Sequence, residues 1–124
     1  MSKNNSSDHP VLIVEDDQDV RQALGLLLID EGYNVLSAGN GLEALNLLKG
    51  NTAPCLIVLD LMMPVMDGWT FLAQRAIDPA PLAVPVVVVT AHLPVPGEPQ
   101  LEVASTIQKA INVSAFLDVV NAYC

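Results

Sequence analysis

The chain has 124 residues, of which 52% are hydrophobic, and it carries a formal net charge of −9. This length suits one domain with a core of its own, without a second module. No apolar run reaches the roughly 18 residues of a membrane span, and the acidic balance disfavours direct binding of nucleic acid, which needs Lys and Arg to neutralise phosphates. Residues 1–9 are polar, so we expect a disordered tail without a secretory signal, followed by a cytoplasmic domain over residues 10–124.

Strand and helix patterns alternate along the chain. Apolar, strand-length runs predict strands over residues 11–16, 34–38, 55–60, 84–90 and 105–108. Helical periodicity predicts helices over residues 18–31, 40–49, about 68–76 and from 112 onward. Gly32 is placed to end the first helix and Asn40 to cap the second. Such alternation implies right-handed crossovers, and therefore an α/β fold with a five-stranded parallel sheet and helices on both faces.

The apolar spacing also assigns an inward face to these helices. The inward residues are expected to be Leu42, Leu45 and Leu48 in the second helix and Val113, Phe116, Leu117 and Val120 in the last.

Prolines interrupt the alternation where a fourth helix is due. Pro94, Pro96 and Pro99 fall within residues 92–100, and proline inside a helix costs about 3 kcal/mol. We therefore expect this helix to be degraded, with at best a short remnant near residues 100–104.

The two cysteines are too few for a disulfide framework. Cys55 begins an apolar strand and Cys124 is 69 positions further along, so we expect two free thiols.

Acidic residues end two of the predicted strands. Glu15 and Asp16 follow the first strand, and Asp60 ends the third. Carboxylates brought together at one edge of the sheet repel one another, which raises their pKa values unless a cation lies between them. Mg²⁺ prefers such oxygen ligands and keeps positions for water and phosphate. Solvated acids in loops are the simpler alternative.

A hydroxyl and an ammonium are predicted at the same edge. Thr90 ends the fourth strand, and Lys109 follows the last short strand. Each has an ordinary alternative, a strand-forming threonine and a solvated surface lysine. Together with the acids, however, they form a set suited to phosphoryl transfer onto the Asp60 carboxylate, with charge offset by the metal and the lysine.

Four motifs carry a resemblance to a known family. They are Val-Leu-Ile-Val-Glu-Asp-Asp (11–17), Val-Leu-Asp-Leu-Met-Met-Pro-Val-Met-Asp-Gly (58–68), Val-Val-Thr-Ala (88–91) and Gln-Lys-Ala-Ile (108–111). In this order and spacing, from about Pro10 to Ala122, the chain resembles the receiver domain of two-component response regulators. The resemblance implies a flavodoxin-like, doubly wound fold. It also implies Mg²⁺-dependent phosphorylation of Asp60 by a histidine kinase or phosphotransfer protein.

The resemblance assigns a role to each candidate residue. Asp16 and Asp60 would bind Mg²⁺ directly, Glu15 would act through water, and the Met62 backbone carbonyl would complete the protein ligands. Thr90 would bind a phosphoryl oxygen and Lys109 would pair with the phosphate. Asp17 matches no required position and is expected to be a loop acid or an acid at the start of the following helix.

Three departures from the family fall on the half that usually reports phosphorylation. Lys109 is followed by Ala110 where the family has a proline. A cis bond before a non-proline residue costs about 2.5–4 kcal/mol, so we expect a trans bond that re-aims Lys109, with a strained cis bond supported by the fold as the alternative. Thr106 replaces the usual aromatic switch residue, and the interval from Thr90 to Lys109 is short.

These departures keep an alternative open, a pseudo-receiver that does not switch and acts as a protein-docking module. A phosphatase is disfavoured because Asp60-Leu61-Met62 lacks a second acid, and a flavodoxin because no phosphate-binding loop follows the first strand. We expect no enzyme activity beyond the domain's own phosphorylation and dephosphorylation. The sequence is compatible with a downstream protein target or a dimer partner. It does not identify the kinase or tell whether the chain is full-length.

Overall fold

The computed structural model describes residues 9–49, 54–60, 84–90 and 105–124. The strands are β1 (Val11–Val14), β2 (Val35–Ala38), β3 (Leu56–Asp60), β4 (Val86–Thr90) and β5 (Ser105–Gln108), and the helices are α1 (Gln18–Asp30), α2 (Gly41–Lys49) and α4 (Val113–Tyr123). The helices predicted near residues 68–76 and 100–104, and the tail up to residue 8, lie outside these residues. Within the described ranges, no helix is both long and apolar enough to cross a membrane.

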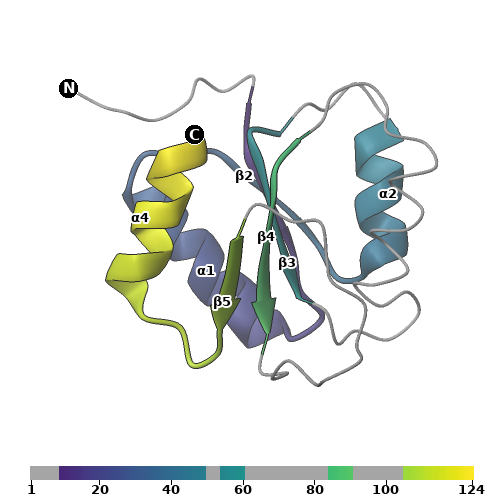
Figure 1. Ribbon diagram of the computed structural model, residues 1–124. Helices are drawn as coiled ribbons and strands as arrows, with labels where there is room; N and C mark the ends of the chain where they lie inside the picture. Colours follow the sequence, from purple (N-terminus) through teal and green to yellow (C-terminus); the bar gives the residue numbers. More distant parts are fainter. Residues whose placement is uncertain (1–8, 50–53, 61–83, 91–104) are drawn as a thin grey trace, which may run out of the picture.

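All five strands pair in parallel in the order β2-β1-β3-β4-β5, which confirms the predicted doubly wound sheet. The chain leaves β1 on one side to form β2 and then crosses to its other side to form β3. In open α/β sheets, ligands bind outside the carboxyl ends of the strands at such a reversal of strand order. Figure 1 shows these ends together at the lower edge of the sheet.

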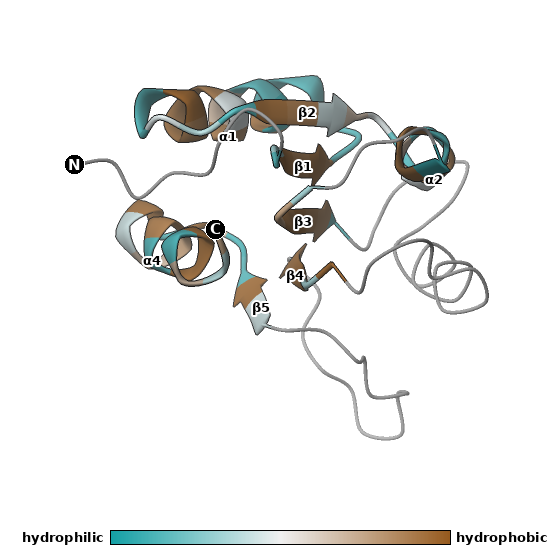
Figure 2. Ribbon diagram, turned by 90° about the horizontal axis from the view of Figure 1, so that it is seen from above, coloured by the Kyte–Doolittle hydropathy of each residue, from teal (hydrophilic) through white to brown (hydrophobic). Residues whose placement is uncertain are grey.

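Helices cover both faces of the sheet, with α1 and α4 on one face and α2 on the other (Figure 2). Successive side chains of β1 serve the two faces in turn. Val11 and Ile13 pack with α1 and α4, whereas Leu12 and Val14 pack with α2. β1, β3 and β4 are buried along their whole length, as expected for central strands of a parallel sheet covered on both sides.

Local signals in the sequence set the ends of α1 as predicted. The Asp17 side chain caps the first turn by accepting hydrogen bonds from the backbone N–H groups of Asp19 and Val20. At the other end, Gly32 has a φ of 94°, its N–H donates to the Ile29 carbonyl, and the Tyr33 N–H donates to the Leu28 carbonyl. This pair of bonds is a Schellman motif, which glycine forms without steric cost.

The predicted inward faces are correct in α4 at Phe116 and Val120, which are fully buried, but wrong at two positions. Leu42 is 47% exposed and Val113 is 45% exposed. Both lie in the first turn of their helices. In α2 the fully buried position belongs to Ala44, which packs with Leu12, Val14 and Ala38, and its small side chain lets the helix lie close to the sheet.

The expectation of two free thiols was wrong. Cys55 and Cys124 form a disulfide that joins residues 69 positions apart, with their Cα atoms 5.4 Å from each other. Cys55 immediately precedes β3 and Cys124 caps the carboxyl end of α4. No local pattern predicts this pairing, because it depends on how α4 packs against the sheet.

Candidate functional site

Three carboxyl groups meet where β1 and β3 end. Glu15 directly follows β1 and is 2% exposed, Asp60 is the last residue of β3 and is 6% exposed, and Asp16 is exposed. Each offers an oxygen atom, and these oxygens all lie within 4.8 Å of one another. The strand positions predicted this proximity; the roles of the three residues stay predictions.

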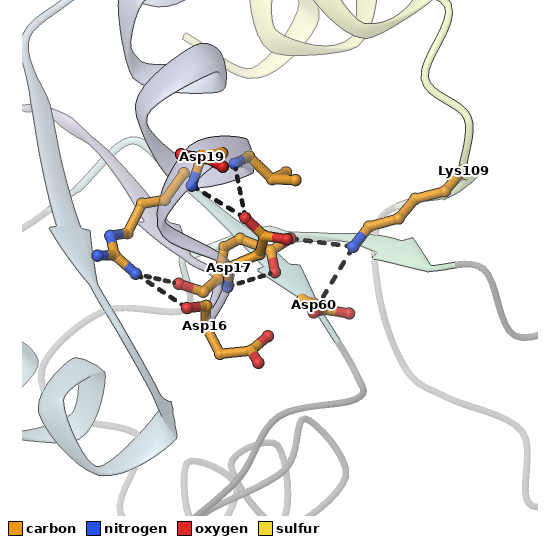
Figure 3. A network of polar contacts seen from close by, with 8 residues as sticks. Asp16, Asp17, Asp19, Asp60 and Lys109 are labelled. Atoms are coloured by element: carbon orange, nitrogen blue, oxygen red, sulfur yellow. Dashed lines mark hydrogen bonds and ion pairs between the residues drawn. The ribbon is translucent and has the colours of Figure 1, made fainter.

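Lys109 faces these acids from the opposite side (Figure 3). Its Nζ lies 3.1 Å from Glu15 Oε1 and 3.7 Å from Asp60 Oδ2. Its backbone N–H donates to the Thr90 carbonyl at 2.8 Å, which continues the pairing of β5 with β4. Lys109 is thus held at its backbone and at its side chain by residues far away in the sequence.

The prediction of a trans bond between Lys109 and Ala110 was wrong, because the bond is cis. The prediction followed the local preference of a non-proline residue. The contacts of Lys109 with Thr90, Glu15 and Asp60 belong to the tertiary structure, which a local preference does not include.

Thr90 lies at the same edge, buried at the carboxyl end of β4. In the pairing of β3 with β4, Asp60 is opposite Val89, so Thr90 is one residue further toward the site. Met62 lies outside the described residues, so its carbonyl stays a prediction.

Burial and like charge perturb the titration of this site. The pKa of Glu15 is raised to about 7, mainly by burial and further by its hydrogen bond and charge interaction with Asp60, while hydrogen bonds from the Asp17 N–H and Lys109 partly oppose the rise. Burial opposes the charge on Lys109, but Glu15 and Asp60 together raise the pKa of Lys109 above its ordinary value. The lysine is therefore charged at neutral pH, whereas the Glu15 carboxyl group is protonated in part of the molecules.

The donor set fits a hard divalent cation. All three side chains offer carboxylate oxygen, which Mg²⁺ prefers, and the exposure of Asp16 leaves one side of the cluster open to water. Burial is the main cause of the raised pKa of Glu15, and the interaction with Asp60 adds to it. Two buried acids face one lysine, and a divalent cation would balance the remaining negative charge.

Sequence reasoning missed Arg21, which organises the loop between β1 and α1. Its Nη1 donates to the Glu15 carbonyl at 2.7 Å and to the Asp16 carbonyl at 3.4 Å. The guanidinium thus fixes the backbone that carries two of the three acids. The sequence did offer a signal for this role, because Arg21 is a cation near the start of the helix that follows the acidic end of β1.

Replacing Arg21 by methionine is expected to weaken Mg²⁺ binding by about 10-fold, because residues that orient metal ligands typically contribute 10–100-fold to affinity. Calorimetric titration of Mg²⁺ into the variant would measure the loss. The control is Gln22→Ala, an exposed position on the same helix, which should leave the affinity unchanged. Equal affinities in the wild type and Arg21→Met would contradict this role.

Without Mg²⁺, the protein is expected to lose stability as the pH rises from about 4.5 to about 7. A carboxyl group with a raised pKa binds its proton more tightly in the folded state, so its stabilising effect is complete below 4.5 and is lost as the pH passes 7. Urea unfolding at pH 5 and pH 8 should show a loss on the order of 2 kcal/mol attributable to Glu15.

Glu15→Gln should remove that part of the pH dependence, whereas Glu43→Gln, at an exposed position, should retain it. An unchanged pH profile in Glu15→Gln would contradict the assignment.

Comparison with known proteins agrees with this geometry. Residues 11–121 match the family model of the response regulator receiver domain. The chain therefore belongs to the receiver domains of two-component response regulators.

The chain is also similar to individual proteins. It is 40% identical over 83 residues to a probable transcriptional regulator of Pyropia yezoensis, a match that covers 67% of this chain and 37% of that protein. It is 42% identical over 74 residues to a sensor histidine kinase of Helicobacter pylori, covering 59% of this chain and 9% of that protein. A CheY-like receiver domain from Methanospirillum hungatei has a TM-score of 0.82 at 28% identity, with 94% of each chain covered. The chain thus spans well under half of the length of these two curated relatives.

Proposed function

We propose that the chain accepts a phosphoryl group on Asp60 and thereby serves as the phosphoacceptor of a two-component phosphorelay. One observation carries this proposal: the buried Asp60 carboxylate lies 3.7 Å from the Lys109 ammonium, in a cluster whose carboxylate oxygens approach within 4.8 Å. A solvated acidic loop would have neither the burial nor the facing cation.

In the proposed reaction, a carboxylate oxygen of Asp60 attacks the phosphorus atom of a phosphohistidine. The new P–O bond forms as the P–N bond breaks, and the imidazole nitrogen keeps the electron pair. The charged Lys109 ammonium stabilises the phosphoryl oxygens, and the Thr90 hydroxyl donates to one of them.

Asp16 and Asp60 would hold Mg²⁺, with Glu15 acting through water and the Met62 carbonyl completing the protein ligands. The bound ion would neutralise charge on the phosphoryl group. Because proton and metal compete for Glu15, Mg²⁺ affinity should increase as the pH rises through about 7.

Receiver domains act with histidine kinases or phosphotransfer proteins, and we propose a donor of that class here. The donor must place a phosphohistidine over the edge of the sheet where β1 and β3 end. We also propose that the domain works in the cytoplasm.

The proposal is tested with a small phosphodonor such as acetyl phosphate. Incubation with Mg²⁺ should add one phosphoryl group, detected by intact-protein mass spectrometry and mapped to the peptide containing Asp60. Chelation of Mg²⁺ should prevent the addition. Absence of a mass shift in protein shown to bind Mg²⁺ would reject the proposal.

A second candidate, a docking module that does not switch, is favoured by the residue at position 106. Thr106 lies exposed on β5. It has no aromatic ring that could move between two positions when Asp60 is phosphorylated. Amide NMR spectra with and without Mg²⁺ and beryllofluoride distinguish the two candidates. Changes confined to the neighbourhood of Asp60 support docking alone, whereas changes reaching β5 and α4 support switching.

A further inference from the structure

Several contacts attach α4 to the rest of the domain. Phe116 and Val120 are fully buried in the core formed with α1 and the sheet. The hydroxyl of Tyr33, which is 2% exposed, hydrogen-bonds Asn121 Oδ1. The third attachment is the disulfide between Cys124 and Cys55.

The disulfide lies at the opposite end of the sheet from the acidic cluster. Cys55 immediately precedes β3, whereas Asp60 is its last residue. Five residues of parallel strand span about 16 Å. Figure 1 agrees, because the C mark at Cys124 lies away from the strand arrowhead of β4. The cysteine pair therefore takes no part in the proposed chemistry of Asp60.

The position of the two cysteines allows exchange with small thiols. Both residues pack against the core but are only partly buried, so neither is enclosed in it. The chain contains no other cysteine, so only one intramolecular disulfide can form. The noncovalent attachments of α4, through Phe116, Val120 and the Tyr33–Asn121 hydrogen bond, do not involve sulfur and would persist after reduction.

We propose that Cys55 and Cys124 form a reversible thiol–disulfide site, which exchanges with low-molecular-weight thiols and disulfides and in its oxidised form clamps α4 on the sheet. Oxidation by glutathione disulfide proceeds by attack of one cysteine thiolate, which forms a mixed disulfide and releases one glutathione. The second cysteine then displaces the other glutathione. The balance is one protein dithiol and one glutathione disulfide converted to one protein disulfide and two glutathione molecules.

The disulfide should affect the thermal stability of the domain and the local unfolding of α4. A cross-link between distant residues restricts the unfolded chain, and more so for a long loop. The oxidised form should therefore melt about 10 °C above the reduced form. Hydrogen exchange should be slower in oxidised protein at the amides of α4 that follow Phe116, because local opening of this helix would have to break the cross-link.

The test equilibrates the whole chain in glutathione buffers of stepped ratio, with dithiothreitol at the reducing limit. Free thiols are then trapped with an alkylating reagent and counted by mass spectrometry. We expect one transition between zero and two alkylated cysteines, without denaturant, accompanied by the shift in melting temperature. The double variant Cys55→Ser/Cys124→Ser should match the reduced wild type in melting temperature and should not respond to the buffer.

Each contrary outcome overturns a defined part of the proposal. Two alkylated or two glutathione-modified cysteines at every ratio would show that the pair does not form. A disulfide that resists dithiothreitol in the folded protein would show that it is not reversible. Equal melting temperatures and equal exchange rates in the two forms would show that it does not clamp α4. None of these outcomes bears on phosphorylation of Asp60, which is measured separately.

Discussion

The variant Asp60→Asn is expected to incorporate no phosphoryl group under conditions in which the wild type takes up one. An amide oxygen is a far weaker nucleophile than a carboxylate, and the substitution also removes one negative charge from the cluster that would hold Mg²⁺. Intact-protein mass spectrometry after incubation with acetyl phosphate and Mg²⁺ measures the outcome.

Folding is not expected to fail in this variant. Asparagine has nearly the size of aspartate, and the substitution removes one buried negative charge that lies beside Glu15. The circular dichroism spectrum should be unchanged. Glu15→Gln, which removes a charge but leaves Asp60 in place, should raise the Mg²⁺ concentration needed for phosphoryl uptake without abolishing uptake.

The matched control is Asp118→Asn, since Asp118 is an exposed acid on α4. It should be phosphorylated like the wild type. Retention of the phosphoryl group in Asp60→Asn, mapped to another residue, would show that a different side chain is the acceptor.

The substitution Phe116→Ala is expected to reduce the free energy of unfolding by about 3–5 kcal/mol, which is the usual cost of deleting a buried aromatic ring. Phe116 is fully buried and is among the largest side chains with no exposure. It packs with residues of α1 and the sheet, so its ring fills the space between α4 and the rest of the domain. Urea unfolding of oxidised protein at constant pH measures the change.

Val113→Ala is the control on the same helix, because Val113 is 45% exposed and surface substitutions usually change stability by less than about 0.5 kcal/mol. A loss below about 1 kcal/mol in Phe116→Ala would mean that neighbouring residues refill the cavity, and that α4 is held chiefly by its other attachments.

A large part of the fold follows from local patterns. Apolar runs predict the buried strands, because a strand covered on both faces needs apolar side chains on both. Asp17, Gly32 and Asn40 mark helix ends because their side chain or backbone freedom satisfies groups that a helix leaves unpaired. The same patterns fail at Leu42 and Val113, since apolar spacing does not tell where a helix begins to meet the sheet.

The chain's own sequence determined the sheet, its order of elements and the meeting of Glu15, Asp16 and Asp60 at one edge, because parallel strands put their carboxyl ends on the same side. Only the tertiary structure decided the contacts between distant segments. These are the approach of Lys109 to Glu15 and Asp60 and the pairing of Cys55 with Cys124. Local preference and periodicity extend over a few residues, whereas these features join residues that meet only once the sheet has formed and α4 has packed against it.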